Sequence, residues 1–421
     1  MKSLYLLGAF CSALIASAAT AQTTLNISVS NPLKTECTDV PVVISLEGRG
    51  VVASALVKDA EGREVACQLD DLNRDETFDE LCFLTDLKGK EKKTFSVTFF
   101  SEGEPRQYPA RVYTEMLMRN DKVKEKNRHN NFIESITARG DCANSYNLQH
   151  HHGVSFESEL NGIRIYFDKR QTLDLYGKFK KRLELQETQF YTSPQQKKEA
   201  YGDDVLWVGQ TFGLGAFRGW DGKEPTMIDP VRSRTQRIVS YGPLRTIVEL
   251  EDRGWKTPST DDKDKKREAL KPVNMTIRYT QYAGHRDTDV DVFFNQDVSN
   301  FRFSTGIINV KGSDEFTDHH GLRGCWGTDW PAGDTVNWNR ETVGLAIWLN
   351  EQNVAREIAT QKAIEQGGNY TYVVKVNGKQ MHYKVAYCSA NEEFGFRSKE
   401  EWFDWMKAWK QEITKPVVVK Y

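Results

Sequence analysis

Eight histidines occur in the sequence, and six of them fall into three groups. Near neutral pH an imidazole serves as a general base, a general acid or a metal ligand. Strand ends that are far apart in sequence can line one cleft of an antiparallel sandwich, so we expect the three groups to lie close together. The six residues are His150, His151, His152, His285, His319 and His320.

Two glycine-rich runs carry tryptophans. Asp203 to Gly215 leads into Gly219-Trp-Asp-Gly222, and Asp318 to Trp330 contains the third histidine group. Flat aromatic faces stack on the apolar faces of sugar rings, and Asp, His and Arg side chains hydrogen-bond sugar hydroxyls and carboxylates. The alternative is that these tryptophans fill the core. The predicted substrate contacts are His150, His152, Arg164, Trp220, Asp221, Arg245, His320, Trp326 and Asp329.

An Asp-rich stretch is a candidate calcium loop. Asp71, Asn73, Asp75 and Asp79 follow the alternating pattern that converges oxygen ligands on a hard cation. The loop departs from the usual pattern at Glu76, where a calcium loop has glycine for its sharp turn. Calcium here would be a structural ion, and the alternative is an Asp-rich hairpin without metal.

An alternative role for the histidines is to bind a zinc ion. His150 and His152 lie on one face if their segment is a strand, and His285 or His320 would add a third ligand. That set would leave one coordination position open for water or substrate. The sequence contains no Gly-x-Ser-x-Gly and no His-Glu-x-x-His motif, which argues against a serine hydrolase and a zincin.

The residues around these candidates predict a mainly β fold. Apolar and polar residues alternate in runs such as Thr246–Leu250, Asn274–Tyr279 and Asp289–Phe294, which is the signature of strands with one buried face. A long helix is predicted from Ser398 to Thr414, and we expect its stripe of tryptophans to pack on the sandwich. Val417 to Tyr421 is a candidate last strand.

The chain is expected to have two β domains after a leader. A turn-rich boundary near residues 104–115 separates a small N-terminal β-sandwich, residues 22–105, from a large antiparallel β-supersandwich, residues 106–421. The large domain carries the candidate cleft and the C-terminal helix. Six cysteines follow the leader and allow 15 full pairings, among which the sequence does not choose; a disulfide between Cys67 and Cys82 is the candidate within the first domain.

Residues 1–21 have the three parts of a secretory signal. Lys2 is positively charged, Leu4–Ala18 is mostly apolar, and Ala19-Thr-Ala21 is a small-residue cleavage motif. No later apolar run is long enough to span a bilayer. With a net charge of -2 and both signs interspersed, the sequence shows no basic patch for nucleic acid or anionic membranes. We therefore expect a periplasmic or secreted protein without membrane insertion.

Several of these segments resemble one family of exported proteins. The matching segments are His150–Glu159, Tyr166–Gly177, Asp203–Gly222, Gly324–Trp330 and, for the fold, Tyr282–Asp291. The family has no assigned function, comes from gut and marine Bacteroidota, and is usually found in polysaccharide-utilisation gene sets. The resemblance implies a galactose-mutarotase-like β-sandwich and a partner that is an oligosaccharide or polysaccharide fragment, in company with enzymes that handle unsaturated uronic acids.

Elimination from a uronic acid is the reaction expected of such a protein, as a lyase or dehydratase. It needs a cation on the sugar carboxylate, a base for the C5 proton and an acid for the leaving oxygen. The candidates are His151 and His285 for the base, Tyr166 and Tyr241 for the acid, and Arg164 and Arg245 for the cation.

Two alternatives stay open. A glycoside hydrolase would use paired carboxylates such as Glu157 and Asp329. A non-catalytic glycan-binding protein would depend on its tryptophans and not on its histidines. None of these three functions implies a definite cofactor, and the candidate ligands of this kind are the calcium and zinc ions.

Overall fold

The computed structural model describes residues 22–123, 128, 130–140, 145–257, 272–333, 335–336, 338–360 and 368–421. Strands dominate these residues, every pairing between named strands is antiparallel, and a helix lies near the C-terminus, so the predicted fold class is confirmed. The predicted signal segment and Cys142 lie outside the described residues. Within the described residues, no helix has the length and apolar character needed to cross a bilayer.

The N-terminal sandwich packs two sheets against each other. Alternation in strands such as Lys92–Phe100 turns Phe95, Val97 and Phe99 into its core, while the intervening residues face outward. One sheet has the order β27-β1-β7-β3-β4 and the other β2-β6-β5. Their strands are β1 (Gln22–Ser30), β2 (Cys37–Ser45), β3 (Ser54–Asp59), β4 (Glu64–Val65), β5 (Cys67–Asp70), β6 (Glu80–Leu87), β7 (Lys92–Phe100) and β27 (Val418–Lys420).

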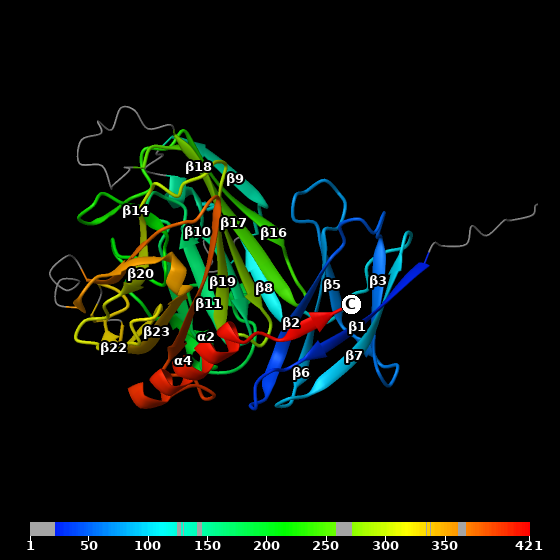
Figure 1. Cartoon of the computed structure of the whole chain (residues 1–421). Helices are drawn as coiled ribbons and strands as arrows, with labels where there is room; N and C mark the ends of the chain where they lie inside the picture. The colour runs from blue at the N-terminus through cyan, green and yellow to red at the C-terminus, as the bar shows by residue number, and fades with distance from the viewer. Residues whose placement is uncertain are drawn as a thin grey trace, which may run out of the picture.

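The last strand crosses the predicted domain boundary. β27 pairs with β1, with Val419 opposite Val29, so the candidate strand at the end of the chain exists. It completes a sheet of the N-terminal sandwich and not of the large one, and Figure 1 shows it in red beside the blue β1. The end of the chain therefore fastens the two sandwiches together.

The large sandwich buries its core between a nine-stranded sheet and two five-stranded sheets. The long sheet has the order β21-β22-β23-β26-β19-β18-β17-β16-β9, and the others are β13-β12-β11-β10-β8 and β15-β14-β20-β25-β24. The strands from β8 to β17 are β8 (Val112–Glu115), β9 (Ser135–Arg139), β10 (Gly153–Ser158), β11 (Gly162–Tyr166), β12 (Leu173–Gly177), β13 (Asp203–Asp204), β14 (Arg218–Trp220), β15 (Pro225–Thr226), β16 (Ser233–Ser240) and β17 (Arg245–Trp255). The remaining strands are β18 (Val273–Tyr282), β19 (Asp287–Phe294), β20 (Phe303–Ile308), β21 (Asp314–Thr317), β22 (Leu322–Asp329), β23 (Glu341–Leu349), β24 (Val354–Glu357), β25 (Asn369–Val374) and β26 (Gln380–Ser389).

Helix α4 (Lys399–Thr414) covers the outer face of the long sheet. Its N-cap is Ser398, whose hydroxyl accepts a hydrogen bond from Glu401 N at 3.3 Å, as predicted. Trp402 and Trp409 are buried on its inner side, so the tryptophan stripe packs on the sandwich. Trp326, a predicted substrate contact, belongs to the same cluster and lies under the helix instead.

Two short helices lie in the chain between β12 and β13. They are α1 (Leu185–Thr188) and α2 (Pro194–Lys198), and α2 begins with a capping box on Ser193. This segment covers the outer face of β10 to β12, where Phe190 packs against Tyr176 with ring centroids 5.6 Å apart.

The expected Cys67–Cys82 disulfide is wrong, because both thiols are free. Cys67 lies directly opposite Phe83 in the β5–β6 ladder, so the neighbouring Cys82 points to the other face of the sheet. Burial raises the pKa of Cys82 to about 12, which keeps this thiol protonated.

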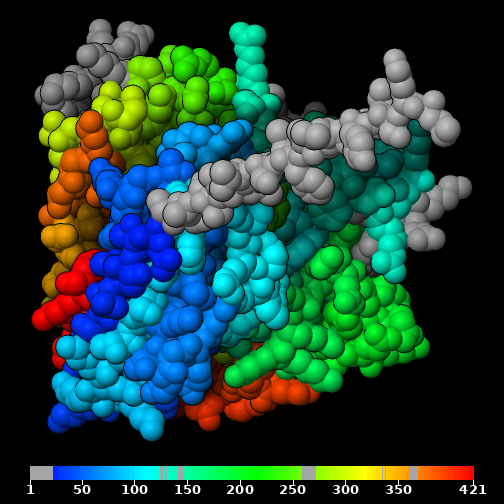
Figure 2. Space-filling model, turned by 90° about the vertical axis from the view of Figure 1, so that its right-hand side faces the viewer, coloured from blue at the N-terminus to red at the C-terminus, as the bar shows by residue number. Residues whose placement is uncertain are grey.

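The two sandwiches meet through buried polar contacts. Gln68 accepts hydrogen bonds from the backbone of Leu244 and Arg245, at 2.7 and 3.0 Å. Arg245 bonds Asp70 through Nε at 2.7 Å and Glu80 through Nη2 at 2.7 Å, and only 3% of its side chain is exposed. Arg245 therefore joins the domains and is not placed to hold a substrate carboxylate. Figure 2 looks onto the N-terminal sandwich, in blue, which covers part of the larger one.

Candidate functional site

A row of polar side chains crosses the outer face of the β8–β10–β11–β12 sheet. Glu115, Ser155, Arg164 and Asp174 lie directly opposite one another on these four neighbouring strands. Residues opposite each other in a ladder share a face. The alternate residues of the same strands, among them Phe156 and Ile163, point into the core, so the sequence pattern itself separates the two faces. We call this outer surface the polar face.

Arg164 holds two carboxylates at the centre of the polar face. Its Nη2 donates to Asp174 Oδ2 at 2.7 Å and to Asp204 Oδ2 at 2.9 Å, and its Nη1 donates to the Tyr191 hydroxyl at 3.0 Å. The Tyr166 hydroxyl donates to the same Asp174 oxygen at 2.9 Å. Arg164 is buried and its donors are used, so it orients neighbouring groups and does not itself grip a ligand.

The surroundings raise the pKa of two of these groups. Burial, followed by the negative charge of Asp174, raises the pKa of Asp204 well above its ordinary value. The same two causes, in the same order, raise the pKa of Tyr166. An acid that stays protonated at neutral pH, beside an ionised or hydrogen-bonded partner, is the arrangement that proton donors in active sites share.

Aromatic and imidazole rings form the accessible edge of this group. His150 packs edge-on against Tyr191 with centroids 5.5 Å apart, and the His152 and Tyr166 rings lie 5.9 Å apart. All four are half-buried. His152 has a φ of +71°, a left-handed conformation that is uncommon for residues other than glycine and is often found at functional sites.

A cation lies at this edge, and an exposed tryptophan follows Asp204 in the chain. The Arg170 guanidinium lies 4.6 Å from the centroid of the Tyr166 ring and is paired with Asp168 at 2.6 Å. Trp207 follows Asp204 by three residues and leaves 56% of its surface exposed, an unusual extent for tryptophan. Sugar rings stack on such exposed indoles.

His151 lies behind this edge. It is fully buried, and its Nε2 is 3.3 Å from both Glu115 Oε1 and Ser155 Oγ. A nucleophile–base–acid triad needs one partner on each ring nitrogen, and here both share one nitrogen. Burial raises the pKa of Glu115 to about 8. The structure thus places His151 as a supporting residue and not as the base predicted from the sequence.

The remaining predicted residues do not converge here. Trp220 is buried against Ile358 and Val373, and Asp221 accepts hydrogen bonds from the backbone of its own turn. His319 and His320 pair on the surface with Glu357 and Glu351, at 3.1 and 2.9 Å. Three more predicted residues lie away from Arg164 and its carboxylates: Tyr241 half-exposed after β16 and near Tyr113 of β8, Asp329 opposite Glu341 on the long sheet, and Trp326 under α4.

The Asp-rich loop makes its own hydrogen bonds. Asp71 accepts from the backbone of Arg74 at 2.6 Å and Glu76 at 2.9 Å, and Asp79 accepts from Leu72 N at 2.7 Å. Glu76 has a φ of +68°, the conformation for which calcium loops use glycine. No group of three or more His, Cys, Asp and Glu side chains among the described residues is placed to hold a metal ion. Calcium and zinc remain predictions.

Sequence reasoning missed Asp174, Asp204 and Tyr191. The signal for Asp174 was present, because Leu173-Asp-Leu-Tyr-Gly177 alternates like a strand and puts Asp174 on the polar side. Asp204 lies on β13, a two-residue strand too short to show an alternating pattern, and Tyr191 comes from the segment between α1 and α2, so nothing local marks either as a site residue.

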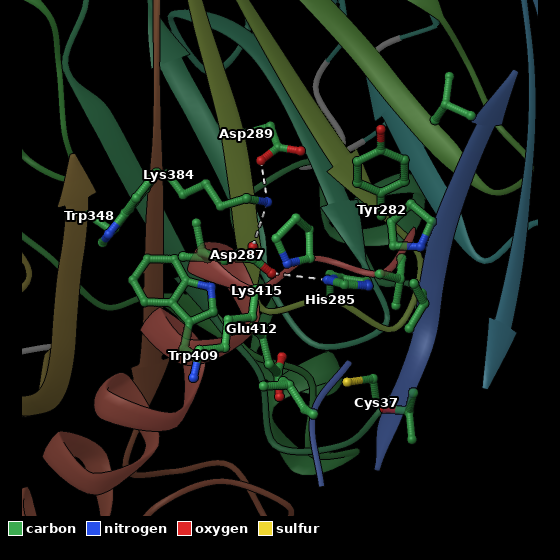
Figure 3. Close-up of a pocket in the computed structure, with 18 of the residues that line it drawn as sticks. Cys37, Tyr282, His285, Asp287, Asp289, Trp348, Lys384, Trp409, Glu412 and Lys415 are labelled. Atoms are coloured by element: carbon green, nitrogen blue, oxygen red, sulfur yellow. Dashed lines mark hydrogen bonds and ion pairs between the residues drawn. The ribbon is translucent and has the colours of Figure 1, made fainter. Parts of the chain in front are cut away.

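His285 lies elsewhere, in a cavity between the two sandwiches. The cavity has a volume of about 420 Å³ and is bounded by the N-terminal sandwich, the outer face of the long sheet and the end of α4. Figure 3 shows His285 beside Asp287, with Lys384 reaching Asp287 and Asp289 across the floor. The shared cleft expected for the three histidine groups is therefore not present.

Both ring nitrogens of His285 carry protons. Nδ1 is 3.0 Å from Asp287 Oδ1 and Nε2 is 2.9 Å from the Asp39 carbonyl oxygen, and both partners accept. Burial acts to lower the pKa of His285, but the hydrogen bond and charge of Asp287 outweigh it and raise the pKa. This imidazolium bridges the sandwiches and has no lone pair with which to act as a base. A Cβ on the preceding Gly284 (φ +71°) would come within 2.0 Å of Asp39 Oδ2, so glycine is needed for this approach.

Replacing His285 by alanine should cost about 1.5–3 kcal/mol of the free energy of unfolding at pH 6. The folded-state pKa is raised, so the imidazolium contribution is complete below about pH 6.5 and is lost as the pH rises through the raised value. Denaturant unfolding of both proteins from pH 6 to 9 measures this difference. The exposed His320→Ala is the control, and a His285→Ala penalty that does not change with pH would contradict the bridge.

Fold and site together define a two-sandwich antiparallel β protein with a buried Arg–carboxylate centre under an edge of histidine and tyrosine rings. The chain belongs to the family described as a domain of unknown function, DUF4861, whose model matches residues 29–419. The expected membership of a family without assigned function is thus confirmed, and the expected bacterial group and gene sets stay predictions. No curated protein matches the sequence.

Two solved structures are similar to the chain at a distance. One is an alpha-mannosidase from Enterococcus faecalis V583, with 11% identity and a TM-score of 0.44, covering 94% of this chain and 46% of that one. The other is a protein in the glycosyl hydrolase family 38 from Enterococcus faecalis, with 11% identity, a TM-score of 0.46 and coverage of 94% and 47%. The chain spans about half the length of these proteins, and neither likeness is close enough to assign an activity.

Proposed function

We propose that the protein is a carbohydrate-active enzyme that acts on uronic-acid-containing oligosaccharides at the edge of the polar face. The observation that carries this proposal is the convergence of His150, His152, Arg164 and Tyr166, four residues singled out for sugar chemistry, beside Asp204, whose pKa is raised. Trp207, three residues after Asp204, is exposed and offers a stacking surface for a sugar ring.

Elimination is the reaction that these groups serve best. His152, at the accessible edge, takes the C5 proton, the C4–O bond breaks, and a C4=C5 double bond forms. Tyr166, whose raised pKa keeps it protonated, gives its proton to the leaving oxygen. Arg164 Nη2, 3.0 Å from the Tyr166 hydroxyl, stabilises the phenolate that results. Arg170 is the cation nearest this edge and faces the sugar carboxylate.

Hydrolysis is the second candidate, and one observation favours it. Asp174 and Asp204 share Arg164 Nη2, and Asp204 is the member of the pair with the raised pKa, as a general acid requires. The pair predicted from the sequence is less suitable. Glu157 is buried, bonded to Lys178 Nζ at 2.5 Å and to two backbone amides.

Product analysis tests the proposal. Purified protein is incubated with a panel of uronate oligosaccharides, and both ultraviolet absorbance and new reducing ends are followed. Elimination produces the absorbance band of an unsaturated uronate, whereas hydrolysis produces reducing ends without that band. Binding of the same sugars with neither product would overturn the enzyme and leave the non-catalytic glycan-binding protein.

We also propose that the enzyme works outside the cytoplasm, in the periplasm or after secretion, on fragments cut from a larger polysaccharide. The signal-like residues 1–21 support this location. The mass of the protein recovered from a periplasmic extract of the producing bacterium should equal that of a chain cleaved after Ala21. An uncleaved chain in the cytoplasm would overturn the location.

A further inference from the structure

The cavity between the sandwiches has features of a ligand site that are separate from the polar face. Its volume of about 420 Å³ lies in the range of small-molecule sites, which occur preferentially at domain interfaces. Apolar side chains form two of its walls. Leu33, Val40 and Val43 come from the N-terminal sandwich, and Ile413 and Val417 come from the end of α4 and the segment after it.

A buried donor without a partner points into this cavity. Trp409 is 4% exposed, lines the cavity, and its Nε1 has no hydrogen-bond partner among the described residues. Figure 3 shows its ring nitrogen turned toward the cavity. Leaving a buried N–H unpaired is costly, so such groups are rare in folded proteins. An acceptor atom on a ligand would satisfy it.

The charged floor of the cavity is already balanced. His285 and Lys384 carry positive charge, and Asp287 and Asp289 accept from them, at 3.0 Å between His285 Nδ1 and Asp287 and 3.0 Å between Lys384 Nζ and Asp287. An ionic ligand group placed on this floor would find a counter-ion only by breaking one of these ion pairs, which is unfavourable. The floor therefore favours a ligand without net charge.

Hydrogen-bonding groups for a ligand remain available at the mouth of the cavity. Glu412 and Thr38 line the cavity, and in the described part of the chain neither side chain has a hydrogen bond or an ion pair. Together with the Trp409 donor, they offer one donor, one acceptor and one hydroxyl that does both. The indole rings of Trp348 and Trp409 supply flat apolar surface beside them. Hydroxyl groups arranged around an apolar ring face match this set.

We propose that the cavity binds a neutral saccharide of one or two rings, which bridges the two sandwiches and stabilises their association. The site does not rest on the proposed catalytic function. It lies against the outer face of the long sheet, whereas the catalytic groups lie on the outer face of the β8–β12 sheet on the other side of the core. Its occupant contacts both sandwiches at once, so binding raises the melting temperature.

Titration calorimetry with three neutral disaccharides, cellobiose, lactose and maltose, and with charged galacturonate tests the site. At least one neutral sugar is expected to bind and galacturonate is not. Trp409→Phe removes the donor but keeps an aromatic ring, and should weaken binding about tenfold. Val43→Trp fills the cavity and should abolish binding. Glu400→Gln, in the exposed first turn of the same helix, is the matched control.

Alkylation of the wild-type protein keeps the test independent of these variants. Cys37 lines the cavity and is half-buried, so a bound sugar should slow its reaction with N-ethylmaleimide, followed at that residue by peptide mass mapping. Tyr166→Phe should lose turnover but keep both binding and protection, which separates this site from the catalytic one. The proposal is overturned if no neutral disaccharide binds or protects Cys37, if only galacturonate does, or if binding survives Val43→Trp unchanged.

Discussion

Replacing Arg245 by alanine is expected to lower the free energy of unfolding by about 3–5 kcal/mol, because it leaves buried charge without a partner. Asp70 is 3% exposed and bonds Arg245 Nε at 2.7 Å, and Glu80 bonds Arg245 Nη2. Both carboxylates belong to the N-terminal sandwich and Arg245 to the large one. We therefore expect the two sandwiches to lose their common unfolding transition as well as stability.

Denaturant unfolding followed by circular dichroism measures the loss of stability, and calorimetry of thermal unfolding shows whether the two sandwiches still unfold together. Arg253→Ala is the matched control, since Arg253 lies on the same strand, is 53% exposed and pairs with Glu251 at 2.9 Å. An exposed pair of this kind contributes about 1 kcal/mol or less. Arg245→Lys keeps the charge but not the two-pronged geometry, and should fall between the two. Equal losses for Arg245→Ala and Arg253→Ala would show that the buried contacts do not hold the sandwiches together.

Replacing Tyr166 by phenylalanine is expected to reduce kcat/KM on a uronate oligosaccharide by about 10²–10⁴-fold, the usual range for a lost acid–base group. The ring and its packing against His152 stay, so KM should change little. The loss should therefore appear in kcat. The phenol also bonds Asp174 at 2.9 Å, and a thermal melt checks that the variant remains folded.

Two further variants make this result specific. Tyr241→Phe removes a hydroxyl from a tyrosine that is 50% exposed, follows β16 and is not among the groups bonded to Arg164, and it should leave turnover unchanged. Asp204→Asn distinguishes the two reactions, because hydrolysis needs the Asp204 proton and the elimination described above takes its proton from Tyr166. Wild-type turnover by Tyr166→Phe would exclude Tyr166 as the acid.

The local structure of this protein could be predicted from its sequence because the causes are local. Period-2 alternation marks β17, β18 and β19, and each has one side in the core. Ser398 marks the start of α4, and a stripe at helical spacing marks the face that packs. The last strand was visible in the same way, as a short run of valines.

The site could be predicted only in part, and the arginines show why. Arg164 and Arg245 both lie on strands and both end in buried ion pairs with Asp, yet one organises the polar face and the other joins the domains. Which carboxylate meets which arginine depends on two distant strands: Asp70 comes from the other sandwich, and Asp204 comes from β13 at the edge of the same sheet. Neither contact can be recognised from the residues that flank the arginine in the sequence.

For the histidines, too, the type of side chain was evident from the sequence and its surroundings were not. The sequence by itself determined a β-sandwich protein with imidazole, phenol and guanidinium groups suited to sugar chemistry. Only the tertiary structure decided that His152 sits at an accessible edge, that His151 lies buried behind it, and that His285 is a doubly hydrogen-bonded bridge to Asp39. The physical reason is that side-chain type follows from the local sequence, but burial and hydrogen-bond partners depend on which distant strands pack together, and those two decide whether a group can react.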